Sequence, residues 1–477
     1  MRESALHEKE EKEKVLEQGT NEHEEGEDSE NEVDQPEEWQ DEEEHDDGND
    51  AIEMPASSQQ PLMESKQLRD LVKQGNKFAV ALESGYVPLL QIIWGTEQES
   101  GRIGPKGGTY KHFLEGGSYC LALTPSSILR GVIAGDIFET YLGNKDVDLV
   151  RIIQQHNRYG DNIPGFYRVS LVNSEGISPS SGQLLQVLDR IERYCDPQKY
   201  NSSNDIDFAY RMDTVRSNYW QRGWIQKGWR RYLEPEKKDL EEMELPEPSE
   251  GTERDRRPVP RKVESCREYV RIMRERLLKE PDMNKPLARP LSYTGWGKCP
   301  SNRINTHMRH GSSRIMSITD AAYQAAYPQS SVGLRSIVLS FVCEEEHAYF
   351  GEILWTCVGQ TNLVGGGGFN VAPPGESNNS LGKMSAKDVN EVAKWIFRNT
   401  LMKANFAEQT ALMKSRRGRG LFIDDWRQRR SIDDAIEVAK EELDELSKHL
   451  EHRKQVKASA LAFAHQSLTE LKDALGM

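Results

Sequence analysis

The segment 291–313, LSYTGWGKCPSNRINTHMRHGSS, concentrates side chains that can take part in catalysis within a short length of chain. Its apolar and aromatic beginning, which ends in YTG at 293–295, predicts a strand followed by a turn. Either Ser301 or Asn302 is expected to cap a short helix after that turn, and Gly311 is expected to end the helix. The segment thus predicts a tyrosine at a strand end beside a short helix.

Three basic side chains belong to this predicted helix. Arg303, His307 and His310 are spaced at i, i+4 and i+7, so the pattern places them on one helix face. A surface helix ordinarily mixes both charge signs, but no acid interrupts this row. We expect the face to suit an anion such as phosphate.

The segment resembles the second half of a GIY-YIG endonuclease domain. In that family a Y-[IVT]-G triplet is followed by an arginine ten residues after the tyrosine, a histidine four residues later, and a further histidine before a serine pair. The matching positions are Tyr293, Thr294, Gly295, Arg303, His307, His310, Ser312 and Ser313.

A first tyrosine strand is also present. The segment 164–172, PGFYRVSLV, alternates in the manner of a strand, and its GFY triplet at 165–167 looks like the GIY element of the same family. Tyr167 and Tyr293 are 126 residues apart, whereas the family usually separates its two tyrosines by about ten. An insertion at about 175–288 causes this spacing and includes predicted helices at 180–193 and 263–279. Loop closure costs only about 0.6 kcal/mol per doubling of length, so the hairpin can still close.

The remaining family elements follow in order. A helix is expected to begin at 317–320, a strand at 335–344 and a second helix at 345–362. Glu352 lies at the flank of the apolar stripe of this second helix, where the family carries its metal-binding acid. Asn370 follows four glycines and matches the family's last asparagine, with Asn362 as the alternate.

The resemblance implies a small α+β domain with a short antiparallel sheet flanked by helices, and it implies metal-dependent hydrolysis of a phosphodiester. Glu352 would bind one Mg²⁺ or Mn²⁺, which prefer oxygen ligands and retain waters. Arg303 would clamp the scissile phosphate with its planar fork. The other implied roles are placing or activating the water for Tyr167 and Tyr293, proton transfer or phosphate binding for His307 and His310, and fixing the loop for Asn370.

The insertion contains an aromatic and basic run at 219–232, YWQRGWIQKGWRRY. Aromatic rings stack on bases and cations neutralise phosphates, so the run is a candidate nucleic-acid contact. The residues of this prediction are Trp224, Lys227, Trp229, Arg230 and Arg231. The alternative is an amphipathic helix that packs its tryptophans against a neighbouring element.

Composition divides the chain into four parts. Residues 1–50 hold 23 acidic and 4 basic residues, a net charge of −19, so the rest of this −16 chain carries +3. We expect 1–60 to be a disordered acidic tail and 61–160 to be an accessory α/β segment. In the latter, 118–143 predicts a strand and then a helix from about Ser126, and the glycines at 104–108 and 116–117 predict turns. The GIY-YIG-like domain would occupy 161–380.

The last part, 381–477, predicts helices. Ser385 is expected to cap a helix over 386–402, and KSRRGR at 414–419 is a basic link. Apolar residues between 436 and 450 step by three and four, which indicates a seam of about two heptads. Such a helix either associates with a second copy or another protein, or folds back on the core.

Scattered cysteines without a CxxC pair indicate reduced thiols in an intracellular protein of the nucleus or cytoplasm. No apolar run reaches the roughly 18 residues that cross a bilayer, so no membrane partner is expected. The predicted function is a GIY-YIG-type endonuclease that acts on nucleic acid, DNA in preference to RNA. The alternative is an inactive relative that binds nucleic acid or serves as a scaffold, which the 126-residue separation and the threonine at 294 favour. A chance resemblance in a helical interaction protein is the third reading.

Overall fold

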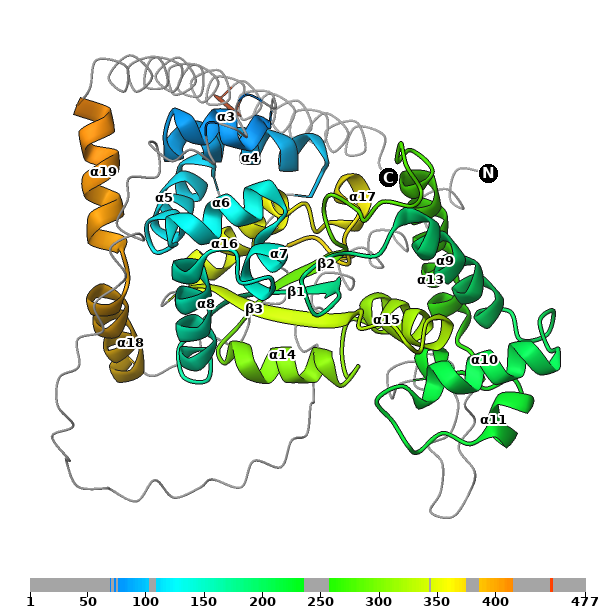
Figure 1. Ribbon diagram of the computed structural model, residues 1–477. Helices are drawn as coiled ribbons and strands as arrows, with labels where there is room; N and C mark the ends of the chain where they lie inside the picture. The colour runs from blue at the N-terminus through cyan, green and yellow to red at the C-terminus, as the bar shows by residue number, and fades with distance from the viewer. Residues whose placement is uncertain are drawn as a thin grey trace, which may run out of the picture. The chain divides into compact units, whose positions relative to one another are not determined.

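The computed structural model describes residues 69, 73, 76–102, 109–235, 257–342, 345–374, 386–414, 447 and 448. The predicted acidic tail, Ser385 and nearly all of the predicted heptad seam lie outside these residues. Within them, no helix is long and apolar enough to cross a membrane. The described part is α+β, with one three-stranded antiparallel sheet and helices on both of its faces (Figure 1).

The elements follow one another in three groups. Before the first strand come α3 (Lys77–Glu83), α4 (Tyr86–Glu99), α5 (Tyr110–Ala122), α6 (Ser126–Ala134), α7 (Ile137–Leu142) and α8 (Val147–Tyr159). Strand β1 (Gly165–Val172) precedes α9 (Ser181–Tyr194), α10 (Ser203–Thr214), α11 (Arg222–Gln226), the 3₁₀ helix η4 (Arg231–Leu233) and α13 (Pro260–Leu277). The third group is β2 (Ser292–Gly297), α14 (Pro300–Met308), α15 (Arg314–Ala326), β3 (Gly333–Phe341), α16 (Glu345–Val358), α17 (Leu363–Gly366), α18 (Ala386–Asn399) and α19 (Met402–Lys414).

The sheet has the strand order β2-β1-β3, and β1 is antiparallel to both neighbours. Tyr167 lies opposite Gly295, and Val169 lies opposite Tyr293. The two tyrosine strands therefore pair directly although 126 residues separate the tyrosines in the sequence. The predicted strands at 164–172 and 335–344 are confirmed, and the strand at 291 continues through the predicted turn to Gly297.

Each face of β1 packs on a different hydrophobic cluster, because successive side chains of a strand point to opposite faces. Phe166 and Val172 pack with the amino-terminal helices and α16, while Tyr167, Val169 and Leu171 pack with α9, α13 and α15. All eight residues of β1 are buried. The insertion between the tyrosine strands thus supplies much of the second cluster rather than a solvent-exposed loop.

The segment 76–160 is helical in its described residues, so the strand expected in 118–143 is wrong. The turn expected at Gly116 and Gly117 is also wrong, because both lie inside α5. A Cβ on Gly116 would lie 2.1 Å from Phe350 of α16, and one on Gly117 would lie 2.6 Å from Leu90 of α4. These glycines allow close helix packing, and the segment joins the core of the sheet. The glycines at 104–108 lie outside the described residues.

A Gly116→Ala variant is expected to lower the free energy of unfolding by about 1–3 kcal/mol, because the added methyl overpacks the α5–α16 contact. Gly95→Ala is the matched control, since Gly95 is also helical but has open space around it. The control is expected to gain about 0.5–1 kcal/mol from helix propensity. Urea unfolding of both variants measures the difference, and equal midpoints would contradict the proposed packing.

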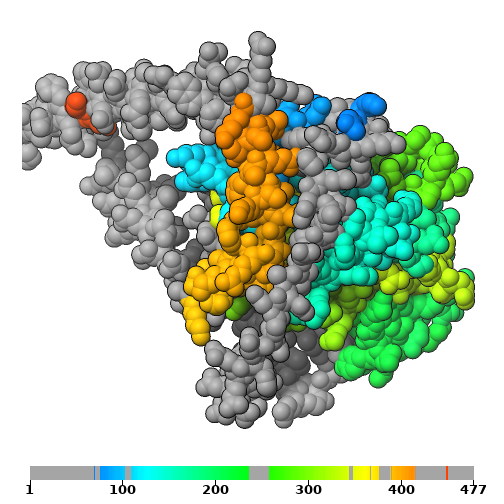
Figure 2. All heavy atoms as spheres, turned by 60° about the vertical axis from the view of Figure 1, so that its left-hand side comes forward, coloured from blue at the N-terminus to red at the C-terminus, as the bar shows by residue number. Residues whose placement is uncertain are grey.

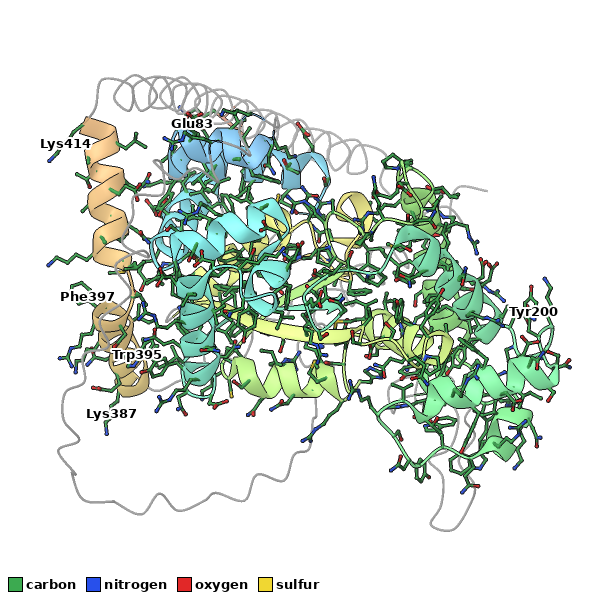
Figure 3. All side chains as sticks on the ribbon, viewed as in Figure 1. Glu83, Tyr200, Lys387, Trp395, Phe397 and Lys414 are labelled. Atoms are coloured by element: carbon green, nitrogen blue, oxygen red, sulfur yellow. The ribbon has the colours of Figure 1, made fainter. Side chains whose placement is uncertain are left out.

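The helix expected over 386–402 is divided in two, because α18 ends at Asn399 and α19 begins at Met402. On α18, the Trp395 ring lies 4.7 Å from that of Tyr159, whereas Phe397 is 58% exposed (Figure 3). The Asn405 amide of α19 donates to the carbonyls of Ala122 and Thr124. Figure 2 shows both helices in orange on one face of the molecule.

Candidate active site

The two tyrosines lie on the same face of the sheet because Tyr167 and Val169 share a face and Tyr293 pairs with Val169. Their ring centroids are 6.2 Å apart. Gly295 makes this approach possible, since a Cβ there would lie 2.8 Å from the Tyr167 hydroxyl oxygen and 2.8 Å from the Tyr293 ring. The glycine of the YTG triplet therefore provides the space that the two phenols occupy.

His307 of α14 joins the tyrosines. Its Nε2 lies 2.9 Å from the Tyr167 hydroxyl, its Nδ1 lies 2.8 Å from Ser312 Oγ, and its ring centroid is 4.8 Å from that of Tyr293. Burial, and then the charge of Arg303, lower the pKa of His307 to about 3. The imidazole is therefore neutral at physiological pH, and its two nitrogens can accept from one hydroxyl and donate to the other.

Arg303 and Glu352 act electrostatically on the same phenols. Burial, and then the Glu352 carboxylate, raise the pKa of Tyr293 to about 12, while Arg303 and a hydrogen bond with Tyr167 oppose the rise. Burial likewise raises the pKa of Tyr167 well above its ordinary value. Arg303 again lowers this pKa, and Glu352 again raises it. The guanidinium and the carboxylate thus lie within electrostatic reach of both hydroxyls, and both phenols are protonated at neutral pH.

The Arg303 side chain starts beside β2, where a Cβ on Gly297 would lie 2.9 Å from its Cγ. Arg303 is exposed and Tyr293 is half-buried, whereas Glu352 is only 6% exposed. The helix α14 that carries Arg303 begins at Pro300, which suits a first helical position, so the cap expected at Ser301 or Asn302 is displaced. Helix α15 begins at Arg314, three residues before the predicted start.

Asn370 fixes the edge strand. Its side-chain oxygen accepts from the Thr294 amide at 2.9 Å, and its amide nitrogen donates to the Thr294 carbonyl at 2.7 Å. The side chain therefore serves as a surrogate neighbouring strand for β2. Asn362, the alternate, lies beside Asn370 in a backbone bridge. The Thr294 side chain itself points to the face opposite Tyr293, because the two residues are adjacent in a strand.

An Asn370→Ala variant is expected to lose about 1–3 kcal/mol of stability, since it leaves a buried backbone N–H and C=O of Thr294 without these partners. Asn362→Ala is the control in the same loop, and we expect it to lose less. Chemical unfolding monitored by tryptophan fluorescence compares the two. A larger loss in the Asn362 variant would show that Asn370 is not the residue that fixes β2.

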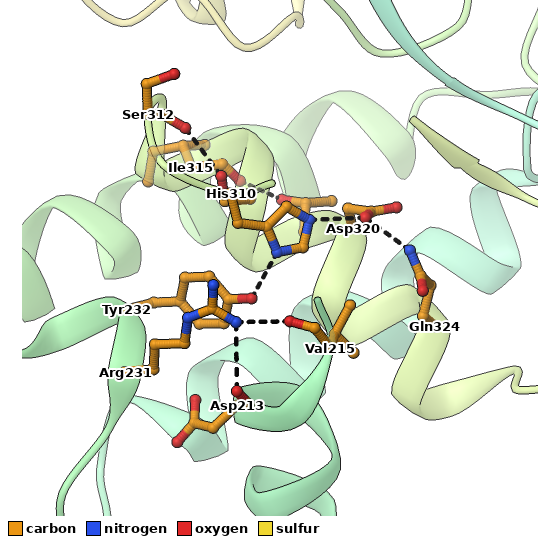
Figure 4. A network of polar contacts seen from close by, with 11 residues as sticks. Asp213, Val215, Arg231, Tyr232, His310, Ser312, Ile315, Asp320 and Gln324 are labelled. Carbon is orange, nitrogen blue, oxygen red and sulfur yellow. Dashed lines mark hydrogen bonds and ion pairs between the residues drawn. The ribbon is translucent and has the colours of Figure 1, made fainter. Parts of the chain in front are cut away.

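His310 departs from the predicted helix face, because α14 ends at Met308 and His310 has a φ of 61°. Its Nδ1 lies 2.7 Å from the Tyr232 hydroxyl and its Nε2 lies 2.8 Å from Asp320 Oδ2 (Figure 4). The prediction that three basic residues share one face of the helix is therefore wrong, because only Arg303 and His307 belong to α14. Sequence reasoning missed Tyr232 and Asp320 as partners of His310, since no local pattern links positions so far apart.

The aromatic and basic run of the insertion is largely internal. Trp229 is 8% exposed and Arg230 is 2% exposed, with the Arg230 guanidinium donating to backbone carbonyls of Tyr194, Ile225 and Trp229. These two side chains are internal, as the packing alternative expects of Trp229, but only Arg222–Gln226 of the run is α-helical and Trp229 lies outside it. Lys227 is exposed, and Trp224 is half-buried with its ring 5.7 Å from that of Trp220.

The candidate site offers one acidic side chain to a metal. Among the described residues, no group of three or more His, Cys, Asp or Glu is arranged to hold an ion. A single buried carboxylate does suit Mg²⁺ or Mn²⁺, which keep several waters and take the rest of their ligands from substrate phosphate. Glu352 thus fits a water-rich site and would not form a closed metal cage.

No family model matches the sequence, and the compared curated proteins and solved structures include no match either.

Proposed function

We propose that this protein is a metal-dependent endonuclease of the GIY-YIG type that hydrolyses phosphodiester bonds of nucleic acid, DNA in preference to RNA. The observation that carries the proposal is the approach of Tyr167 and Tyr293, on paired strands, to a single histidine. Arg303 and Glu352 perturb the same two phenols from different helices. Such a reaction needs an activated water and relief of the phosphoryl charge, which a phenol, a guanidinium and a metal-binding carboxylate can supply.

Each side chain has a chemical role in this proposal. Arg303 neutralises the phosphoryl group, and its exposed position on α14 leaves it open to a substrate. Glu352 would hold the divalent ion, which would supply Lewis-acid activation of phosphate and water. Tyr293 is the more accessible phenol, and its phenolate form takes the proton of the attacking water to give the neutral phenol. Tyr167, which hydrogen-bonds to neutral His307, helps to position the Tyr293 oxygen.

The alternative is a protein that retains the fold and binds nucleic acid without cutting it. The burial of Glu352 and Tyr167 supports this reading, since little of either side chain reaches solvent. Nicking of supercoiled plasmid and of branched DNA with Mg²⁺ or Mn²⁺, against an EDTA control, separates the two. Cleavage that requires the metal supports the enzyme, and binding without cleavage supports the alternative.

The free thiols of the described cysteines suit an intracellular enzyme of the nucleus or cytoplasm.

The cleavage rate is expected to rise about tenfold per pH unit between about pH 6 and pH 9. The reason is that the phenol of Tyr293, with a pKa of about 12, supplies ten times more phenolate with each unit. The plot of the logarithm of the rate against pH is expected to show no bend near pH 6.5, because the pKa of His307 is about 3 and its charge does not change in this range. Single-turnover rates at saturating enzyme give the profile. A histidine-like bend would count against the neutral role of His307.

A further inference from the structure

A surface pocket of about 690 Å³ lies beside the candidate site. One wall comes from the insertion and includes Arg231, Tyr232 and Lys262, and the other is the loop from His310 to Arg314. The pocket and the candidate site meet at Ser312, which lines the pocket while its hydroxyl contacts His307. The insertion therefore forms part of a second concave surface. The His307 ring lies between this surface and Tyr167, because it contacts both Ser312 and the Tyr167 hydroxyl.

The lining carries three cations and one acid. Arg231, Lys262 and Arg314 line the pocket, opposed by Glu234. Within the described residues, neither Arg231 nor Arg314 pairs with a carboxylate. The Arg231 guanidinium donates to the carbonyls of Asp213 and Val215 (Figure 4), and Arg314 donates to Ser265 Oγ while its buried Nε lacks a partner. Two guanidinium groups thus line the pocket without a direct ion pair among the described residues, although the Arg231 charge reaches the buried Asp213 carboxyl, whose pKa burial raises and this charge lowers.

Backbone and hydroxyl groups complete an anion-binding lining. The 13-residue helix α15 begins at this pocket, and its cap residue Ser313 makes no side-chain hydrogen bond to the first turn. Its unpaired amides and positive dipole end favour a bound anion. Ser317 Oγ donates to the Ser312 carbonyl and so holds the loop in place. The His310 side chain, held between Tyr232 and Asp320, supports the opposite side of the loop.

We propose that this pocket binds a backbone phosphate of the nucleic-acid strand next to the one at the candidate site; the inference rests on the proposed function. A second hollow of about 420 Å³ adjoins it at Val215, whose carbonyl accepts from Arg231. That hollow is lined by Arg211, Arg216 and Arg335, and its described lining includes no acid. Two successive basic hollows suit an extended polyanion better than one free phosphate ion.

The test measures binding of the full chain to fluorescein-labelled single-stranded and duplex DNA in EDTA, so that no cleavage is needed. Ser313→Asp places a carboxylate in the pocket at the start of α15, where a negative charge stabilises the helix and aspartate tolerates the positive φ of 50°. Affinity is expected to fall about tenfold while the unfolding midpoint is kept or raised. Arg314→Gln is expected to weaken binding about five- to tenfold and to reduce the salt slope by about 1.

Arg271→Gln is the matched control, because Arg271 is an exposed arginine of α13 that pairs with Glu268 and Glu275. DNA affinity that is unchanged in both Ser313→Asp and Arg314→Gln overturns the proposal. A second outcome also overturns it. Inorganic phosphate or a mononucleotide would stabilise the wild type against unfolding, and Ser313→Asp would abolish this stabilisation but would keep its full affinity for DNA. A binding defect without metal-dependent cleavage in the wild type would keep the pocket and reject the nuclease. Metal-dependent cleavage by the wild type, together with unchanged DNA affinity in both variants, would keep the nuclease and reject the pocket.

Discussion

A Glu352→Gln variant is expected to nick DNA at least about a hundredfold more slowly than the wild type under single-turnover conditions. Glutamine preserves the size of the side chain but removes the charge that would hold the divalent ion. Affinity for DNA in EDTA is expected to stay the same or to increase slightly, because a negative charge near the substrate phosphate has been removed. The loss therefore belongs to the chemical step.

A second readout for Glu352 does not depend on activity. The carboxylate raises the pKa of Tyr293 above the rise that burial causes, so the variant is expected to lower that pKa from about 12. Ultraviolet difference titration against Tyr293→Phe measures this change. Glu115→Gln, which alters an exposed acid of α5, serves as the control for both assays. A Glu352 variant with wild-type cleavage would remove the acid from the mechanism.

Arg303→Ala is expected to reduce the cleavage rate by a similar factor of at least about a hundred, because it removes the guanidinium that would neutralise the phosphoryl group. Arg303→Lys is expected to recover only part of the rate, since an ammonium ion retains the charge but not the two-pronged geometry. Arg309→Ala is the matched control, because Arg309 is exposed and lies one residue beyond the end of α14. Equal rates for the Arg303 and Arg309 variants would count against the clamp.

The same substitution has an electrostatic consequence for His307. Burial is the larger cause of its low pKa and the charge of Arg303 is the second, so Arg303→Ala is expected to raise that pKa from about 3. Titration of the histidine ring by NMR follows the change. An unchanged pKa would place the guanidinium farther from the imidazole than the structure has it.

Local patterns were sufficient for several elements. The alternation of 164–172 predicted β1, and the apolar stripe around Glu352 predicted α16, because both signals come from residues close in sequence. The helix predicted at 180–193 was confirmed as α9, where Ser180 and Gln183 form a capping box. Glycines misled the prediction at 116–117, since a glycine that permits close helix packing looks the same in sequence as one in a turn.

The sequence alone determined which residue types are available to the candidate site and their order along the chain. Only the tertiary structure decided that Tyr167 pairs with a strand 126 residues away, because a strand's partner is selected by burial of both faces and not by distance in sequence. It also separated His310 from His307, since the helix ends at Met308 and a positive φ turns the chain toward Tyr232 and Asp320. Long-range packing made these choices, and a local pattern does not contain them.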